Sequence, residues 1–186
     1  PYKRNSDGKV GMLNLVNGQF FENDGFGKDF IAGSEVRMLD GYEAMDYVTF
    51  HADKLYNLGI IESTYTLNVM FARSETTATP YLYGCVTSPH TASVTAYLSS
   101  GGSWRWGSSY KGLNMNNALI HMVNISNGLV VADFASSTFA KSTFTTPDTV
   151  VIGGYRTASG SLIKNYQGKV FYIRISEGDT MLLDWY

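Results

Sequence analysis

Hydrophobic and polar residues alternate along most of this chain, and a period of two residues is typical of half-buried β-strands. The alternation is clear over residues 65–71, 94–98 and 121–125, where every second side chain is apolar or aromatic. Each stretch is too short for a helix and is bounded by polar or glycine-containing turns. The pattern therefore predicts a protein built mainly of strands.

The strand-like stretch 168–175 has bulky side chains on both of its faces, which predicts a central strand with both faces covered. Strict alternation assigns its residues to two faces: Val170, Tyr172 and Arg174 on one, and Phe171, Ile173 and Ile175 on the other.

Three dipeptides, Asp7-Gly8, Asn17-Gly18 and Asn127-Gly128, each separate two strand-like runs. Asn-Gly and Asp-Gly favour type I′ turns because both central residues of that turn need positive φ. The first 22 residues are therefore expected to form a small meander with strands over 2–4, 10–15 and 19–22.

A single segment, residues 34–47, has a partial helical pattern. Ser34 is a suitable N-cap, but Gly41 interrupts the apolar stripe, so we expect a turn of helix or a connector. No segment supports βαβ units. The expected fold class is an all-β, two-sheet antiparallel sandwich of about a dozen strands.

Composition narrows the classes of function. The chain has 186 residues, enough for one domain, with 16% charged residues and a net charge of −2, which argues against nucleic-acid binding. No 18-residue apolar run is present, so membrane insertion is not expected. The one cysteine, Cys85, excludes an intrachain disulfide, and its apolar surroundings indicate a buried structural thiol rather than a nucleophile.

Several motifs together resemble concanavalin A-like (laminin-G-like) jelly-roll modules. Tyr47-Val-Thr-Phe50 followed by Tyr56-Asn-Leu-Gly-Ile60 resembles the opening of such a module, although the usual Asp-Thr pair is replaced. Gly168-Lys-Val-Phe-Tyr-Ile-Arg-Ile175 resembles its late strand. Ser6-Asp-Gly8, Gly11-Met-Leu-Asn-Leu-Val16 and the glycines of residues 25–33 resemble the tail motif that usually follows that strand.

Here the tail motif comes first in the chain. Either residues 1–33 are the end of an upstream repeat, or the domain is circularly permuted and they complete their own sandwich. We favour the second arrangement because an isolated meander is marginally stable in water. The expected organisation is a meander and glycine-rich loop over 1–33 and a jelly roll over 34–186, with the two chain ends close together.

The resemblance implies a non-catalytic binding module for carbohydrate or cell-surface recognition, of the kind found in gut phage tail proteins and bacterial adhesins. Sugar rings stack on exposed aromatic side chains. Trp104 and Trp106 lie two residues apart and share one face of a strand, with Arg105 on the other. Together with Tyr110 and the Tyr81/Tyr83 pair they form the expected ligand site. The alternative for both tryptophans is core packing, and their solvent exposure decides between the two.

Two other functions remain as alternatives. A structural spacer or assembly domain of a virion or surface protein explains the sequence equally well. A glycoside hydrolase needs two carboxylates on one face. Glu43 and Asp46, three residues apart, fall on opposite faces of a strand, while Glu62, Glu75 and Glu177 are isolated in sequence. We therefore expect no enzyme.

The residues do not predict a transition-metal site, since His51, His90 and His121 are widely spaced without paired acidic or cysteine neighbours. His121 is expected to be a packed or hydrogen-bonded side chain. No cofactor is expected, with structural calcium at Asn23-Asp24 or Asp133 as the open alternative. The expected partner is a glycan or bacterial cell-surface receptor, in a virion tail or outside the cell, with homo-oligomerisation in a larger fibre as a further alternative.

Overall fold

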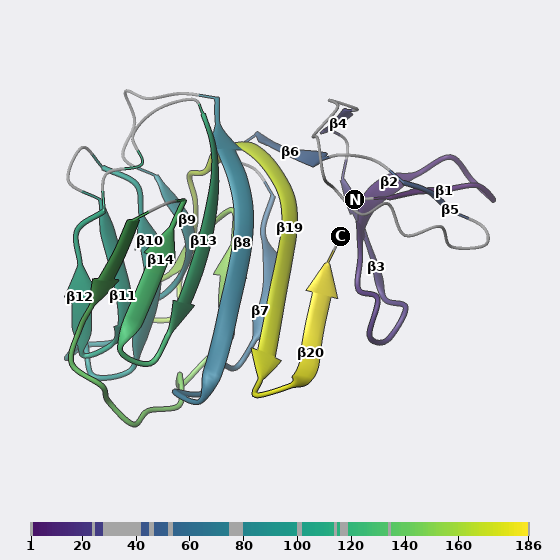
Figure 1. Cartoon of the computed structure of the whole chain (residues 1–186). Coiled ribbons are helices and arrows are strands. Elements are labelled where there is room, and N and C mark those ends of the chain that lie inside the picture. Colours follow the sequence, from purple (N-terminus) through teal and green to yellow (C-terminus); the bar gives the residue numbers. More distant parts are fainter. Residues whose placement is uncertain are drawn as a thin grey trace.

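The structure is a computed structural model, and it describes residues 2–23, 25–27, 42–44, 47–51, 54–74, 80–99, 102–113, 115, 119–133 and 135–185. Every regular element in these ranges is a β-strand, twenty in all. Two eight-stranded sheets form a sandwich, and a four-stranded sheet lies beside it (Figure 1). The all-β, two-sheet sandwich is thereby confirmed, although with more and shorter strands than expected. A turn of helix or a connector is expected over residues 34–47. Residues 42–44 and 47 of this segment lie in strands, and its other residues lie outside the described ranges.

The first sheet has the order β15-β14-β13-β8-β19-β6-β4, and β20 pairs with β19 beside β6. Its two longest strands, β8 and β19, pair along most of their length. The strands are β4 (Gly25–Gly27), β6 (Tyr47–His51), β8 (Tyr65–Arg73), β13 (Ile120–Ser126), β14 (Leu129–Ala132), β15 (Ala135–Thr138), β19 (Gln167–Glu177) and β20 (Thr180–Trp185).

The second sheet has the order β12-β11-β10-β9-β16-β7, and the hairpin β17–β18 joins it at β9. All pairings in it are antiparallel except the single bridge between β17 and β9, which links Arg156 to Cys85. The strands are β7 (Tyr56–Gly59), β9 (Tyr81–Cys85), β10 (Ser93–Tyr97), β11 (Ser103–Gly107), β12 (Ser109–Lys111), β16 (Val150–Ile152), β17 (Gly154–Arg156) and β18 (Leu162–Lys164).

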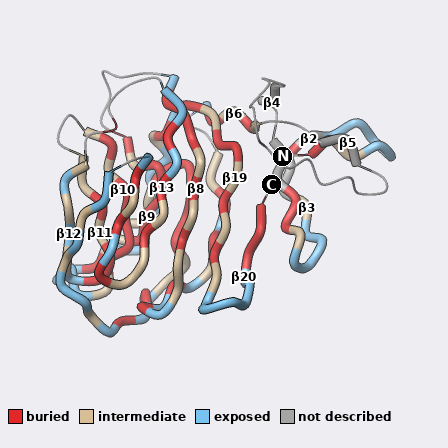
Figure 2. The backbone as a smooth tube through the Cα atoms, in the orientation of Figure 1, coloured by how far each residue is buried: buried red, intermediate tan, exposed pale blue. Residues whose placement is uncertain are grey.

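The core lies between the two large sheets. Buried positions alternate with partly exposed ones along β6, β7, β13, β14 and much of β8, β11 and β19, as period-two patterning requires (Figure 2). The largest fully buried side chains are Trp104, Trp106, Trp185, Tyr2, Tyr83, Tyr166, Phe50 and Phe71. Burial of such aromatic side chains contributes most of the hydrophobic stabilisation in a core of this kind.

A bulge in β19 changes the faces expected from strict alternation. The register shifts between Val170, which pairs with Phe71, and Tyr172, which pairs with Met70. Val170 therefore joins Ile173 and Ile175 in the core, while Tyr172 lies on the outer face. The expectation that Val170 and Tyr172 share a face is wrong, because the extra residue of a bulge reverses the alternation beyond it.

All three hairpin turns differ from the type I′ form. Gly8 N donates to Arg4 O and Gly18 N donates to Asn14 O, so each loop has four residues and ends on the glycine. Positive φ occurs at Gly8, Gly18 and Gly128, but not at Asp7, Asn17 or Asn127. The glycines mark the turns correctly, and the turn type is corrected because type I′ needs positive φ at both central residues.

Replacement of Gly128 by Val is expected to lower the free energy of unfolding by about 1–3 kcal/mol, because a β-branched residue is strained at positive φ. Gly128 has φ +97° between β13 and β14. The side chain of Lys141, 2.8 Å from the position of a Cβ, is flexible, and the carbonyl oxygen of Phe139 lies at an ordinary contact distance of 3.5 Å. The cost is therefore mainly in the backbone. Urea denaturation measures it, with Leu129→Val as the control. A midpoint equal to that of the wild type would contradict the strain.

The N-terminal meander forms its own sheet, in the order β3-β2-β1-β5, and is attached to the last strand of the sandwich. Its strands are β1 (Tyr2–Arg4), β2 (Val10–Leu13), β3 (Phe20–Asn23) and β5 (Tyr42–Ala44). Asn14 forms a β-bridge with Trp185. Leu15 N donates to Asp184 O at 2.7 Å, and Asp184 N donates to Asn14 Oδ1 at 3.3 Å.

This attachment brings the two ends of the described chain together (Figure 1). The buried carboxylate of Asp184 also accepts a hydrogen bond from Arg174 Nε at 2.9 Å, which ties the junction to β19. The meander thus contacts the last strand, as expected, but it does not extend either sheet of the sandwich. The domain boundary between residues 33 and 34 lies outside the described residues.

Candidate functional site

The strand β11 separates the residues expected to bind ligand onto two faces. Trp104 pairs with Ala96 and Trp106 with Val94 of β10, all on the inner face. Both tryptophan side chains are 0% exposed. Trp104 contacts the rings of Phe71 and Tyr83 in the core. The expectation that Trp104 or Trp106 is an exposed ligand residue is therefore wrong, because the inner face of β11 packs against the first sheet.

A second bulge separates Tyr81 from Tyr83. The register between β9 and β10 shifts so that Ala96 pairs with Tyr83 and Tyr97 pairs with Tyr81. Tyr83 is fully buried in the core, whereas Tyr81 lies on the outer face beside Tyr97. Alternation alone places Tyr81 and Tyr83 together, so the bulge decides that only Tyr81 faces outward.

Three of the six expected residues do come together on the outer face of the second sheet. Arg105 and Tyr110 are cross-strand partners, with the guanidinium carbon 5.2 Å from the centre of the Tyr110 ring. Tyr81 lies between two further tyrosines, with ring centres 4.8 Å from Tyr97 and 4.1 Å from Tyr155. We call Tyr81, Tyr97, Arg105, Tyr110 and Tyr155 the tyrosine surface.

The β17–β18 hairpin completes this surface by folding back over β9. Gly84 has no side chain, which leaves room for Tyr155: a Cβ on Gly84 would lie 2.8 Å from Tyr155 Cβ. The backbone N–H of Tyr81 donates to Oδ1 of Asn165, just beyond β18, at 3.1 Å. The hairpin is thus held to β9 beside the tyrosine cluster.

The environment of Tyr81 keeps its phenol neutral. Partial burial raises the pKa of Tyr81, the neighbouring Tyr155 and Tyr97 raise it further, and Arg105 offsets part of the effect. A tyrosine phenol is protonated at neutral pH even without this shift, so it is both a hydrogen-bond donor and an acceptor. Tyr110 is the most exposed member, at 61%. The surface thus combines aromatic faces with hydroxyl and guanidinium donors.

On the other side of β17 lies a pocket of about 400 Å³. Segments from the end of β9, from the approach to β16 and from the β17–β18 turn form its walls, and we call it the Arg156 pocket. Its lining residues are Cys85, Val86, Thr87, Ser88, Pro147, Asp148, Arg156, Thr157, Ala158, Ser159 and Gly160.

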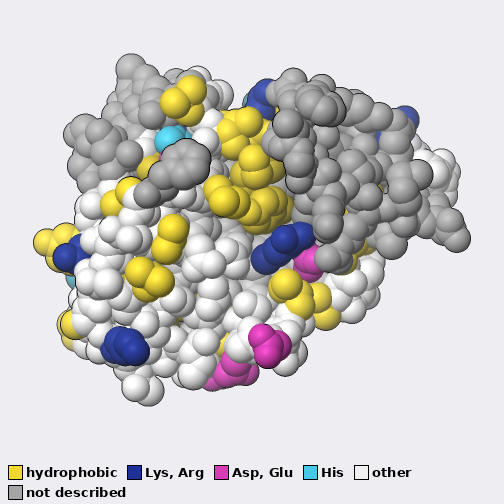
Figure 3. All heavy atoms as spheres, viewed as in Figure 1, with side chains coloured by type: hydrophobic (Ala, Val, Ile, Leu, Met, Phe, Trp, Pro, Cys, Tyr) yellow, Lys and Arg dark blue, Asp and Glu magenta, His cyan; other side chains and the backbone are white. Residues whose placement is uncertain are grey.

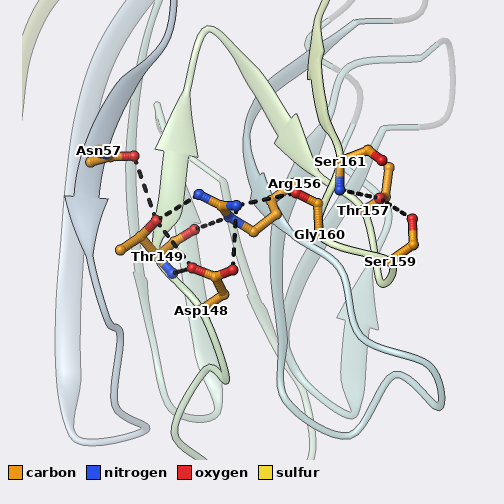
Figure 4. Close-up of polar contacts among 8 residues, drawn as sticks. All are labelled: Asn57, Asp148, Thr149, Arg156, Thr157, Ser159, Gly160 and Ser161. Atoms are coloured by element: carbon orange, nitrogen blue, oxygen red, sulfur yellow. Dashed lines mark hydrogen bonds and ion pairs between the residues drawn. The ribbon is translucent and has the colours of Figure 1, made fainter.

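Arg156 connects the walls of this pocket (Figure 4). Its Nε donates to Thr149 O at 3.3 Å and its NH2 to Thr149 Oγ1 at 3.1 Å. The NH1 group donates to Gly160 O at 3.2 Å and lies 3.3 Å from Asp148 Oδ2. One planar guanidinium thus links the β17–β18 turn to Asp148 and Thr149, just before β16.

Cys85 lines this pocket at a buried position. Its side chain belongs to the core, and burial is the main cause that raises the pKa of its thiol. The expected structural cysteine is confirmed, since a buried thiol with a raised pKa is a poor nucleophile.

His121 and Asp133 form a hydrogen-bonded pair at the ends of β13 and β14. His121 Nδ1 lies 2.8 Å from Asp133 Oδ2, and Met122 N donates to Asp133 Oδ1 at 2.9 Å. His121 also packs on Phe71, so the expected packed and hydrogen-bonded histidine is confirmed. Both Asp133 oxygens serve this local network. The other calcium candidate, Asp24, lies outside the described residues.

Within the described ranges, no group of three or more His, Cys, Asp or Glu side chains is arranged to hold a metal ion. No helix in that part of the chain is long and apolar enough to cross a membrane. Among the carboxylates weighed for glycoside hydrolysis, Asp46 and Glu75 lie outside the described residues. Glu177 accepts a hydrogen bond from Thr64 Oγ1 at 2.7 Å at the edge of the sandwich.

The outer face of the first sheet also has hydrophobic side chains. Hydrophobic side chains gather over β8, β19 and β13 (Figure 3). Ile120 and Met122 are largely exposed there, and Met70 and Tyr172 are half-buried beside them. The guanidinium carbon of Arg174 lies 5.1 Å from the centre of the Tyr172 ring. This face therefore also has an arginine–tyrosine pair, but no three-tyrosine cluster like that of the tyrosine surface is described beside it.

Sequence reasoning missed Tyr97, Tyr155, Asp148 and Arg156. Two signals were available. Tyr97 lies between Ala96 and Leu98, which belong to the apolar series with Val94. Because successive side chains of a strand point to opposite faces, Tyr97 is expected on the face opposite that series. The Gly153-Gly154 doublet immediately before Tyr155 indicates a tight backbone approach, but not its partner.

No protein-family model matches this sequence, and no curated protein sequence is similar to it. Its structure is similar to that of the mouse laminin α1 chain, domains LG4-5. The TM-score is 0.51 at 13% sequence identity, covering 76% of this chain and 45% of the laminin chain. The chain has a laminin-G-like jelly-roll fold.

The expected concanavalin A-like architecture is therefore confirmed. In this jelly roll, the tyrosine surface and the Arg156 pocket both lie on the second sheet and its β17–β18 hairpin. The chain spans less than half the length of the laminin structure, and at this level of identity the likeness concerns the fold alone.

Proposed function

We propose that this laminin-G-like module is a non-catalytic binding domain that recognises a glycan on a cell surface through its tyrosine surface. The observation that supports this proposal is the clustering of four tyrosines and one arginine on the outer face of a sheet. Outer faces of sandwiches are usually polar, and a contiguous aromatic patch at a surface marks an interaction site.

The chemistry of the cluster suits a sugar. Aromatic rings pack against the apolar C–H face of a pyranose, and phenol groups are amphipathic enough to remain at a wet surface. Arg105 adds guanidinium donors in a fixed fork beside Tyr110, which suits the oxygens of neighbouring hydroxyls. Because Tyr81, Tyr97 and Tyr155 already contact one another, little side-chain entropy is lost on binding.

The parent protein that fits this role is a phage tail or receptor-binding protein, or a bacterial adhesin, with the module displayed on the virion or outside the cell. The runner-up is a structural spacer or assembly domain without a small ligand. The burial of Trp104 and Trp106 favours that alternative, because it assigns to the core the two aromatic residues with the strongest sequence signal.

Binding of the purified chain to a glycan array tests the proposal, followed by titration of the best glycan against variants. Tyr110→Ala and Tyr97→Ala are each expected to weaken binding about tenfold, or 1.4 kcal/mol, in line with a lost aromatic contact. Arg105→Lys keeps the charge but removes the fork, and is expected to weaken binding as well.

Tyr172→Ala is the matched control, because it removes a tyrosine that also faces an arginine, on the outer face of the other sheet. Its affinity is expected to equal that of the wild type. Loss of binding in Tyr172→Ala alone would place the ligand on the first sheet and contradict the proposal. Absence of any bound glycan would leave the spacer as the better explanation.

A further inference from the structure

We propose that the Arg156 pocket is a second ligand site, separate from the tyrosine surface, which takes one uncharged, hydroxyl-rich group such as a terminal sugar unit. Its volume of about 400 Å³ lies near the lower end of the range for small-molecule sites. That size suits a single ring better than an extended chain.

The charge of the pocket selects a neutral ligand. Among the lining residues, Asp148 and Arg156 are the two charged side chains, and they are paired with each other at 3.3 Å. The Arg156 side chain is 17% exposed, whereas that of Asp148 is 48% exposed. Since each charge already has its counter-charge, an ionic ligand would enter without a partner for its own charge, and desolvation would oppose it.

The hydrogen-bonding groups of the pocket match a polyol. Asp148 Oδ1 accepts from Thr149 N at 2.7 Å, and Oδ2 faces Arg156, yet a carboxylate has about four acceptor sites. Ser88, Thr157 and Ser159 line the same pocket, and the hydroxyls of Thr157 and Ser159 are hydrogen-bonded to each other at 2.9 Å. One hydroxyl of a polyol is therefore able to donate to the Asp148 carboxylate while another hydroxyl of the same ligand contacts the hydroxyls of the turn.

The walls are held in place without a ligand. Arg156 binds both the Gly160 carbonyl and Thr149, which fixes the turn against the sheet (Figure 4). Within the turn, Ser161 N donates to Thr157 Oγ1 at 3.0 Å, and Thr157 N donates to Ser161 O at 2.8 Å. A pocket that is formed in advance loses little entropy when it binds a small ligand.

Saturation-transfer NMR with the intact chain tests the site. The probes are the methyl glycosides of glucose, galactose, mannose, fucose and N-acetylglucosamine, with glycerol as a simple triol. We expect at least one glycoside to bind in the millimolar range and glycerol to bind at least tenfold more weakly. Absence of binding by every glycoside up to 100 mM, or equal binding of glycerol, would overturn the assignment.

Ala158→Trp is expected to fill the pocket and reduce glycoside binding at least tenfold. Ala158 lines the pocket at an exposed turn position, so the substitution is not expected to disturb the core. Ala140→Trp makes the same change at an exposed position outside the pocket and is expected to bind normally. Asp148→Asn is expected to weaken binding about tenfold while the protein retains a cooperative thermal transition. Normal glycoside binding by Ala158→Trp would overturn the proposal.

The proposals for the two sites are tested by different variants. Tyr110→Ala is expected to weaken binding to the array glycan about tenfold but to keep the methyl glycoside. Ala158→Trp is expected to keep the array glycan and to lose the methyl glycoside. If Tyr110→Ala also loses the methyl glycoside, the small sugar binds at the tyrosine surface and the second site is refuted.

Discussion

Replacement of Trp104 by Ala is expected to lower the free energy of unfolding by about 3–5 kcal/mol, the usual cost of truncating a fully buried large aromatic side chain. Trp104 is 0% exposed and packs against Phe71 on the first sheet and Tyr83 on its own. The cavity would therefore open at the centre of the sandwich, where both sheets contribute to its walls and neither is free to collapse.

Guanidinium chloride denaturation measures this cost, with Trp104→Phe as a milder variant that folds even if the alanine variant does not. Tyr110→Ala, an aromatic truncation at an exposed position on the neighbouring strand, is expected to change stability by less than about 0.5 kcal/mol. Acrylamide quenching gives a second readout. Trp104, Trp106 and Trp185 are all buried, so quenching is expected to be weak until the protein unfolds. Strong quenching of the native protein would contradict this packing.

Replacement of Gly153 by Ala is expected to cost about 2–5 kcal/mol, since two separate effects add: strain at positive φ and overpacking of the core. Gly153 has φ +95° between β16 and β17. A Cβ there would collide with the carbonyl oxygen of Lys54 and lie 2.8 Å from the Phe50 ring, and both groups belong to packed parts of the sandwich.

Gly59→Ala is the matched control for Gly153→Ala. Gly59 has φ +94°, but nothing lies within 4 Å of the position of its Cβ. Its substitution is expected to cost only the backbone strain, so the difference between the two variants measures the packing. Equal losses in the free energy of unfolding would show that the atoms around Gly153 move aside at little cost, and would contradict the packing effect.

Gly153 also positions the hairpin that contributes residues to both candidate sites. Its N–H donates to Leu82 O, and its carbonyl accepts from Asn165 N and Tyr166 N, so it fixes the point at which the β17–β18 hairpin turns back over the sheet. That turn positions Tyr155 in the tyrosine surface and Arg156 in the pocket. A folded Gly153→Ala protein is therefore expected to be impaired at both sites.

The sequence by itself determined the fold class and the positions of the turns. Alternation over β8, β10 and β13 predicted the strands, because side chains of a strand point to opposite faces at every step. The glycines after Asp7, Asn17 and Asn127 marked the hairpins, since the backbone there needs positive φ. Alternation and turn glycines are local signals, because each depends only on residues close together in the sequence.

Only the tertiary structure decided which face is inside. Alternation placed Trp104 and Trp106 on one face and Arg105 on the other, but the choice of the buried face depends on which side of β11 the first sheet covers. The bulges beside Leu82 and at Phe171 reversed the faces of Tyr81 and Tyr172, because one extra residue inverts a period of two.

Long-range pairing decided the composition of both candidate sites. Tyr155 meets Tyr81, and Arg156 pairs with Cys85, across about seventy residues of chain, because the β17–β18 hairpin folds over β9. The Gly153-Gly154 doublet signalled a tight backbone approach without naming its partner. Local patterning thus specified the strands and turns, whereas the packing of distant strands determined which side chains share a surface, since that depends on contacts between residues far apart in the sequence.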